Sequence, residues 1–158
     1  MSPRLPICAA LAAIALLWSA PPGRAAQDEA TVIRACAEKY IDNVEEAERR
    51  CIFAIVADPC ANMPANQNTA GTTDCYDRER KIWDAMLNEN FRALSADLDE
   101  KQKVKLRDMQ RAWIAYRDTT CGFYHDKIQG TMATPMAAAC VARETARRAL
   151  LLKVFQGL

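Results

Sequence analysis

The sequence predicts an all-α protein, an antiparallel bundle of about four helices that is stapled by disulfide bonds. Apolar residues recur every three or four positions over long stretches, which is the period of a helix that buries one face. The alternating pattern of a half-buried strand is missing. An even number of cysteines follows an N-terminal export signal, which is typical of a disulfide-bonded exported protein.

Residues 1–25 have the features of a secretory signal peptide. Arg4 supplies the positive charge, residues 5–20 are almost wholly apolar, and Gly23 and Ala25 are small residues at the −3 and −1 positions of a cleavage site. The apolar run is shorter than the roughly 20 residues of a membrane-spanning helix, and an uncleaved anchor is the alternative. We therefore expect a periplasmic or secreted protein, one domain over residues 26–158, with no membrane attachment once the signal is removed.

Six cysteines remain in the mature chain, and disulfide bonds are their expected fate. A zinc site is the competing interpretation, but no two cysteines have a Cys-x-x-Cys spacing and His125 is the only histidine. No metal or other cofactor is therefore expected. The pairing cannot be chosen from the count alone; the candidates are Cys36, Cys51, Cys60, Cys75, Cys121 and Cys140.

An acidic N-terminal helix is expected within residues 26–57, beginning at Gln27. Asp42 and Asn43 are a possible break, because their side chains compete for backbone hydrogen bonds. The break matters for Cys36 and Cys51. Along an unbroken helix they would stand about 22 Å apart and could not bond.

Residues 58–73 are expected to form a loop, because they are rich in Pro, Asn, Gly and Thr. A loop of this length is unusual in a compact domain. A disulfide between Cys60 and Cys75, at its two ends, would explain it. The alternative is a binding finger, because a constrained loop loses less entropy when it binds.

The remaining residues, 74–158, are expected to form the helical core. Asp74 is a plausible N-cap for a helix ending near Leu98, and Asp99 with Gln102 forms a capping box for the next. The short turn between them predicts antiparallel neighbours. The apolar stripe of the first of these helices comprises Trp83, Leu87, Phe91, Leu94 and Leu98.

Residues 110–121 continue an apolar stripe that begins at Leu106, and a polar line runs beside it. Leu106, Met109, Trp113 and Tyr116 form the apolar stripe, and Gln110, Arg117 and Cys121 follow the polar line. Counting outwards from the turn at Leu98 and Asp99 places Asn88 opposite Gln110, and Asp84 opposite Arg117. This register predicts an Asn88–Gln110 hydrogen bond and an Asp84–Arg117 ion pair, both partly buried between the two helices.

The last helix is expected to run to about Phe155, with Thr134 as its N-cap and Pro135 in its first turn. Gln129 and Gly130 close the helix before it. Cys121 and Cys140 then lie at the same end of a helical hairpin, and this is the disulfide that the sequence favours most.

Charge is unevenly distributed along the chain. Residues 26–77 hold 4 basic and 10 acidic residues (net −6), and residues 78–158 hold 15 basic and 10 acidic residues (net +5). Two oppositely charged halves can attract each other within the molecule, or the acidic half can face a basic partner. Binding to nucleic acid is not expected, because the mature charge is −1 and the basic residues are mixed with acids.

No catalytic constellation is evident in the sequence. His125 has no nucleophile of matching spacing, and the thiols are expected in disulfides. Asp84 is expected to stay ionised beside Arg117, which disfavours a general acid. Phosphate-binding and dinucleotide motifs are missing. The sequence therefore favours a protein that is not an enzyme.

Several residues together resemble the LprI-type lysozyme inhibitor family. The resemblance covers roughly residues 75–150, and Cys36, Cys51 and Cys60 are similar to an extended subset of that family. Where such sequences often have Gly-Gly before the last helix, this one has Gln129 and Gly130. The residues that carry the resemblance are Cys75, Trp83, Asp84, Leu87, Asn88, Phe91, Leu94, Leu106, Gln110, Arg111, Ala112, Trp113, Tyr116, Arg117, Asp118, Cys121, Cys140, Thr145 and Arg148.

The resemblance implies a small exported bacterial helical protein that binds and inhibits a lysozyme. Its partner would be a lysozyme-type glycan hydrolase, which in the common animal type is basic and has two carboxylates in a cleft. Residues 58–73 or 129–135 could enter that cleft. An envelope structural or accessory module without a lysozyme target is the alternative. An acidic face could steer the encounter, and its residues are Asp42, Glu45, Glu46 and Glu48.

Overall fold

The all-α prediction is confirmed. The computed structural model describes residues 22–158, so residues 1–21 of the expected signal peptide lie outside the described chain. No strand occurs within residues 22–158. The helices are α1 (Pro22–Lys39), α2 (Val44–Cys51), α3 (Ala57–Ala61), the 3-10 helix η1 (Pro64–Asn66), α4 (Thr69–Ala96), α5 (Glu100–Ile128) and α6 (Ala133–Phe155).

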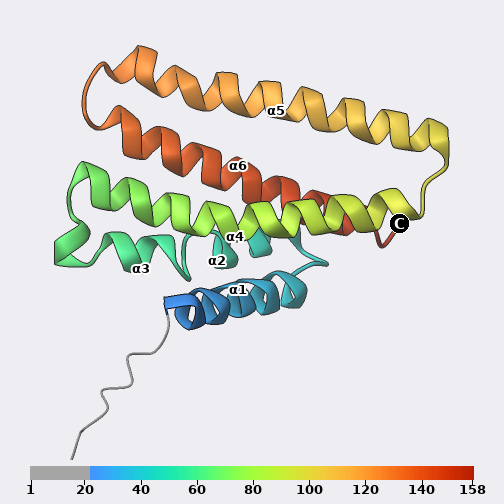
Figure 1. The fold of residues 1–158 in the computed structure, drawn as a ribbon, viewed down its shortest axis with the longest axis horizontal. Coiled ribbons are helices and arrows are strands. Elements are labelled where there is room, and N and C mark those ends of the chain that lie inside the picture. Colours follow the sequence, from blue (N-terminus) through green and yellow to red (C-terminus); the bar gives the residue numbers. More distant parts are fainter. Residues whose placement is uncertain (1–21) are drawn as a thin grey trace, which may run out of the picture.

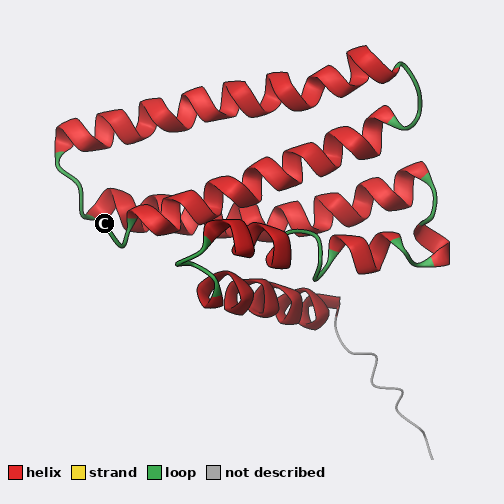
Figure 2. Ribbon diagram, turned by 180° about the vertical axis from the view of Figure 1, so that it is seen from behind, coloured by secondary structure: helices red, strands yellow, loops and turns green. Residues whose placement is uncertain are grey.

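Three long helices, α4, α5 and α6, form the main layer of the molecule, with α6 between the other two (Figure 1). Helices α4 and α6 run parallel to each other, and α5 runs antiparallel to both. The shorter helices α1, α2 and α3 gather beside α4 and α6, away from α5 (Figure 2). All the α-helices contribute residues to one common core. Among these residues are Ile33, Trp83, Leu94, Leu106 and Leu150.

The position of α6 overturns the expected packing of α4 directly against α5. Asn88 donates instead to the carbonyl of Asp84, one turn earlier on its own helix (2.8 Å). Gln110 accepts from Nε of Arg148 on α6 (2.9 Å), and Arg117 forms an ion pair with its neighbour Asp118 (2.7 Å). The Asn88–Gln110 and Asp84–Arg117 contacts are therefore not formed among the described residues.

The difference between α5 and α6 explains this arrangement. Helix α6 buries nine residues and is rich in alanine, so other helices can approach it closely from several sides. Helix α5 buries only Leu106 and Cys121 along its whole length. Trp113 is half-buried, and Tyr116, expected on the apolar stripe, has 54% of its surface exposed.

The expected break at Asp42 and Asn43 is present. Helix α1 ends at Lys39, and the side chain of Asn43 caps α2 by accepting from the backbone N–H of Glu46 (3.1 Å). The chain folds back at this break, and Cys36 and Cys51 form a disulfide with a Cα–Cα distance of 5.8 Å. The helix expected to continue to residue 57 ends instead at Cys51.

A turn at residues 52–56 follows α2, and Glu79 of α4 holds it. Phe53 has a φ of 71°, in the left-handed region that few side chains adopt. The fully buried carboxylate of Glu79 accepts hydrogen bonds from the backbone N–H groups of Phe53 (2.7 Å) and Ala57 (2.9 Å), and from Nε1 of Trp83 (2.9 Å). One buried carboxylate therefore fixes the corner between α2 and α3.

The loop expected at residues 58–73 is mostly helical. It contains α3 and η1, and α4 begins at Thr69 with Asn68 as its N-cap, five residues before the expected boundary. The side chain of Asn68 accepts from the N–H of Gly71 (2.9 Å), so the N-cap assigned to Asp74 was wrong. The Cys60–Cys75 disulfide joins α3 to α4, with a Cα–Cα distance of 5.6 Å.

The ends of α5 agree with expectation better than the start of α6. Asp99 and Gln102 form the expected capping box, and Gln129 closes α5 with a φ of 48°. Helix α6 begins at Ala133 after Met132, so Thr134 is not its N-cap. Pro135 is the third helical residue, where the backbone N–H has no acceptor within the helix.

Candidate protein-binding surfaces

The residues of the 110–121 segment bind α5 to α6. The guanidinium groups of Arg117 and Arg148 lie 4.9 Å and 5.7 Å from the centre of the Trp113 ring. Arg148 is only 6% exposed, its Nε donates to Gln110, and its Nη2 has no partner among the described residues. Burial lowers the pKa of this guanidinium. The cluster joins two helices and presents little of Arg148 to a partner.

The other residues of the sequence motif lie on two helices, α4 and α5, that α6 separates. Asp84 is half-buried on α4, and Asn88 is exposed one turn later. On α5, Tyr116 and Asp118 are exposed. The structure therefore does not bring these residues together with Trp113 into a cleft that could hold a ligand.

The acidic face of α2 is partly neutralised within the molecule. Glu46 pairs with both Arg49 and Arg50 of its own helix, and Glu48 pairs with Arg147 of α6 (2.8 Å). Asp42 and Glu45 are exposed, and no ion pair to either is found in the part of the chain described here. Two of the four expected acidic residues thus keep an unpaired charge at the surface.

Ion pairs also connect the acidic and basic halves of the chain. Glu29 of α1 pairs with Arg78 of α4 (2.6 Å), and Glu38 of α1 pairs with Lys153 of α6 (3.0 Å). A pair of opposite polarity joins Arg34 of α1 to Glu89 of α4 (2.5 Å). Part of the charge difference between the halves is therefore balanced where the short helices meet the long ones.

The two segments considered for insertion into a cleft lie at the same end of the molecule. We call this the disulfide end and define it as residues 62–68, between α3 and α4, together with residues 129–132, between α5 and α6. Helices α4 and α6 are parallel and both begin there, which brings the two connections to one end (Figures 1 and 2). The Cys60–Cys75 and Cys121–Cys140 disulfides brace them.

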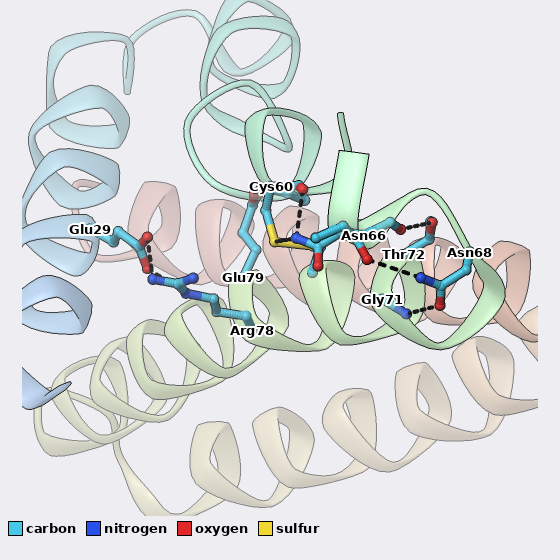
Figure 3. The surroundings of a disulfide bond; sticks show 11 residues. Glu29, Cys60, Asn66, Asn68, Gly71, Thr72, Arg78 and Glu79 are labelled. Atoms are coloured by element: carbon cyan, nitrogen blue, oxygen red, sulfur yellow. Dashed lines mark hydrogen bonds and ion pairs between the residues drawn. A yellow bond between two sulfur atoms is a disulfide. The ribbon is translucent and has the colours of Figure 1, made fainter. Parts of the chain in front are cut away.

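Hydrogen bonds hold residues 62–68 against the start of α4 (Figure 3). Nδ2 of Asn66 donates to the carbonyl of Cys60 (2.9 Å), and the hydroxyl of Thr72 donates to the carbonyl of Asn66 (3.1 Å). Nδ2 of Asn68 donates to the carbonyl of Ala65 (3.0 Å). A Cβ on Gly71 would lie 2.7 Å from Cα of Asn66, so only glycine permits this approach.

The disulfide end carries almost no charge. Residues 59–73 and residues 128–142 contain no Asp, Glu, Lys or Arg, although 26% of the chain is charged. Three large apolar side chains nearby are more than half exposed: Met63 (56%), Met132 (58%) and Phe123 (61%). Few charges with exposed Met and aromatic side chains are typical of the centre of a protein–protein interface.

A cleft of about 290 Å³ between α1, α4 and α6 contains the Arg34–Glu89 and Glu38–Lys153 ion pairs. Within residues 22–158 there is no group of three or more His, Cys, Asp or Glu side chains able to hold a metal ion. In the same range, none of the helices combines the length and apolar character needed to cross a membrane.

Comparisons with known proteins identify one family. The family model described as "Lysozyme inhibitor LprI" matches residues 60–152, more than half of the 158 residues. This range begins at Cys60 in α3 and includes the disulfide end, but not α1 or α2. An uncharacterised protein of Rhizobium meliloti (strain 1021) is 30% identical over an alignment of 93 residues, with a coverage of 50% of this chain and 67% of the relative. No solved structure matches this chain.

Proposed function

This chain belongs to the LprI lysozyme inhibitor family, and from that membership we propose that it binds a lysozyme-type glycan hydrolase and inhibits it by protein–protein contact. The family match over residues 60–152 is the observation that carries the proposal. The three disulfides and the family together indicate an extracytoplasmic protein. We propose that residues 1–25 direct it to the periplasm or outside the cell.

We propose a binding role and no catalytic one. His125 is exposed on α5. The fully buried carboxylate of Glu79 is occupied by three N–H donors. An inhibitor of this kind acts by occupying the surface of its target, for which a rigid scaffold with preformed loops is well suited.

Asp42 and the acidic residues of α2 are proposed to steer the encounter and not to form its centre. Asp42 and Glu45 keep exposed charges, whereas Glu46 and Glu48 are paired with arginines. A basic lysozyme would therefore associate faster at low ionic strength, where these charges are least screened.

The test is inhibition of cell-wall lysis by the purified oxidised protein. A panel of muramidases that includes an animal c-type lysozyme would be assayed in rising salt, with reduced and alkylated protein as the control. We expect inhibition of at least one enzyme by the oxidised form, strongest at low salt. If no enzyme of the panel is inhibited at low salt, the proposal fails for those enzymes, and a structural or accessory role in the envelope is favoured.

A further inference from the structure

We propose that the disulfide end enters the glycan-binding cleft of the target hydrolase, with residues 62–68 as the inserted part. This inference rests on the proposed function and adds to it the contact surface and the mode of inhibition. If the loop occupies the cleft, the protein and the glycan compete for the same space.

The first support is the rigidity and exposure of the loop. Residues 62–65 and residues 67–68 are exposed, while the half-buried side chain of Asn66 joins the loop to α3. The Cys60–Cys75 disulfide and the close approach of Gly71 to Asn66 restrain both ends. A loop that is already ordered loses little conformational entropy on binding, which is required of a segment that must fit a narrow cleft.

The second support is the chemistry of the loop. The glycan that fills such a cleft is a chain bearing hydroxyl and N-acetyl amide groups. Asn62 and Gln67 are exposed and carry amides, although Nε2 of Gln67 also donates to the carbonyl of Asn62 (3.2 Å). The thioether of Met63 offers an apolar contact beside them. Because residues 59–73 have no charge, the loop can lie near two catalytic carboxylates without burying a charge of its own or repelling them.

The third support is the second connection at the same end. Met132 precedes α6 and is 58% exposed, and the segment from residue 128 to residue 142 is also uncharged. Figure 1 shows the connection between α5 and α6 at the end of the molecule where α4 begins. This connection can therefore contact the rim of a cleft that receives residues 62–68. Both connections lie within the part of the chain that matches the family model, whereas the acidic helix α2 lies outside it.

The test compares charged substitutions at the two ends of the molecule, in the full oxidised protein. Met63→Glu and Met132→Glu alter exposed side chains of the disulfide end. Val104→Glu alters a side chain that is 48% exposed near the opposite end, and it adds the same charge. Affinity for a muramidase that the unaltered protein inhibits would be measured by calorimetry, and circular dichroism would check that each variant is folded.

We expect Met63→Glu to weaken binding at least about tenfold and Met132→Glu to weaken it less, because a buried unpaired carboxylate costs most at the centre of an interface. Val104→Glu should leave the affinity within about twofold. Tri-N-acetylchitotriose, which occupies the cleft of an animal c-type lysozyme, should reduce the apparent affinity of the protein in proportion to its own occupancy.

Two results overturn the inference and leave the proposed function intact. One is inhibition that Met63→Glu and Met132→Glu do not weaken. The other is binding of the protein and the trisaccharide to the enzyme at the same time. A failure of the unaltered protein to inhibit any muramidase is a different result, because it overturns the proposed function and, with it, this inference.

Discussion

Glu79 shows how one side chain can organise a corner of the fold. Val56 precedes α3 and offers no side-chain cap, so the first N–H groups of that helix need another acceptor. Glu79 of α4 is that acceptor, because its carboxylate accepts from the backbone N–H of Ala57. The same carboxylate accepts from the backbone N–H of Phe53, whose φ is in the left-handed region. Burial of a carboxylate is costly, and here three N–H donors and the start of a helix offset that cost.

Substitution of Glu79 should therefore destabilise the protein strongly. Glu79→Ala leaves three buried donors without an acceptor, and we expect a loss of about 3–5 kcal/mol of unfolding free energy. Glu79→Gln keeps one oxygen but turns an amide towards the N–H of Ala57, so a smaller loss of about 1–3 kcal/mol is expected. Urea denaturation would measure both values.

Glu89→Gln is the matched control for these two variants. Glu89 lies on the same helix but is exposed in its pair with Arg34, so its substitution should cost less than about 1 kcal/mol. Equal losses at Glu79 and Glu89 would contradict the role given to the buried carboxylate.

Glu79 was not among the residues predicted from the sequence, although a signal was present. Glu79 stands four residues before Trp83, in line with the apolar stripe of α4. A carboxylate within an apolar stripe predicts a buried charge that needs donors. Which donors it meets could not be predicted, because Phe53 and Ala57 come from a distant turn.

At the scale of the helices, boundaries set by neighbouring residues could be predicted from the sequence, and boundaries set by distant contacts could not. Asn43 and Asp99 cap their own helices through bonds to residues three positions later. Asp99 was predicted as a cap, and Asn43 was predicted only as part of a break between helices. Asp74 is an equally acceptable cap by local pattern. Asn68 takes that role because the Cys60–Cys75 disulfide and the contact of Gly71 with Asn66 continue α4 by another turn.

Gly71 of α4 and Gly122 of α5 should respond in opposite ways to substitution by alanine. In Gly71→Ala the new methyl group meets the backbone of Asn66 at 2.7 Å, and backbone cannot move aside easily, so stability should fall by about 1–3 kcal/mol. In Gly122→Ala the methyl group meets nothing within 4 Å, and α5 should gain about 0.5–1 kcal/mol. Thermal unfolding of both variants would test this, and a stable Gly71→Ala protein would show that residues 62–68 are not held as described.

Helix α5 should depend on its disulfide more than the other long helices do. It buries only Leu106 and Cys121, and Cys121 is itself bonded to Cys140. In a double variant that carries both Cys121→Ser and Cys140→Ser, we expect faster amide exchange in residues 115–128. Helix α4, and α6 beyond its first turns, should remain protected. A Cys36→Ser, Cys51→Ser variant is the control, because that bond joins α1 to α2. Uniform loss of protection in all helices would contradict this picture.

At the scale of the whole molecule, the order of the helices in the main layer was the part that the sequence left undetermined. The helical periodicity shows which residues of α4 and α5 face a partner, and the short turn suggests that they face each other. The alanine-rich surface of α6 offers more burial to both helices than they offer to each other. The packing of α4 and α5 is therefore decided by α6. The apolar patterns of α4 and α5 alone do not show this.

Ion pairs between the halves of the chain make the stability of the folded protein depend on pH. Hydrogen bonding to Arg34 holds the pKa of Glu89 below its usual value. Burial acts to raise the pKa of Asp77, but hydrogen bonds from Lys81 and Arg80 outweigh it and the pKa is lowered. A carboxyl group with a lowered pKa in the folded state stabilises the protein above the pKa of the unfolded chain. That stabilisation is lost as the pH falls through the folded value.

We therefore expect stability to decline as the pH is lowered below about 4.5, the usual range of glutamate, with α1 affected first. Helix α1 is joined to α4 and α6 by Glu29–Arg78, Arg34–Glu89 and Glu38–Lys153, and these exposed pairs each contribute less than about 1 kcal/mol. Amide exchange of residues 28–39 measured between pH 6 and pH 3 would test this. Glu89→Gln should reduce the acid dependence, and an unchanged profile in that variant would mean that burial of Ile33 and the Cys36–Cys51 bond hold α1 without the ion pair.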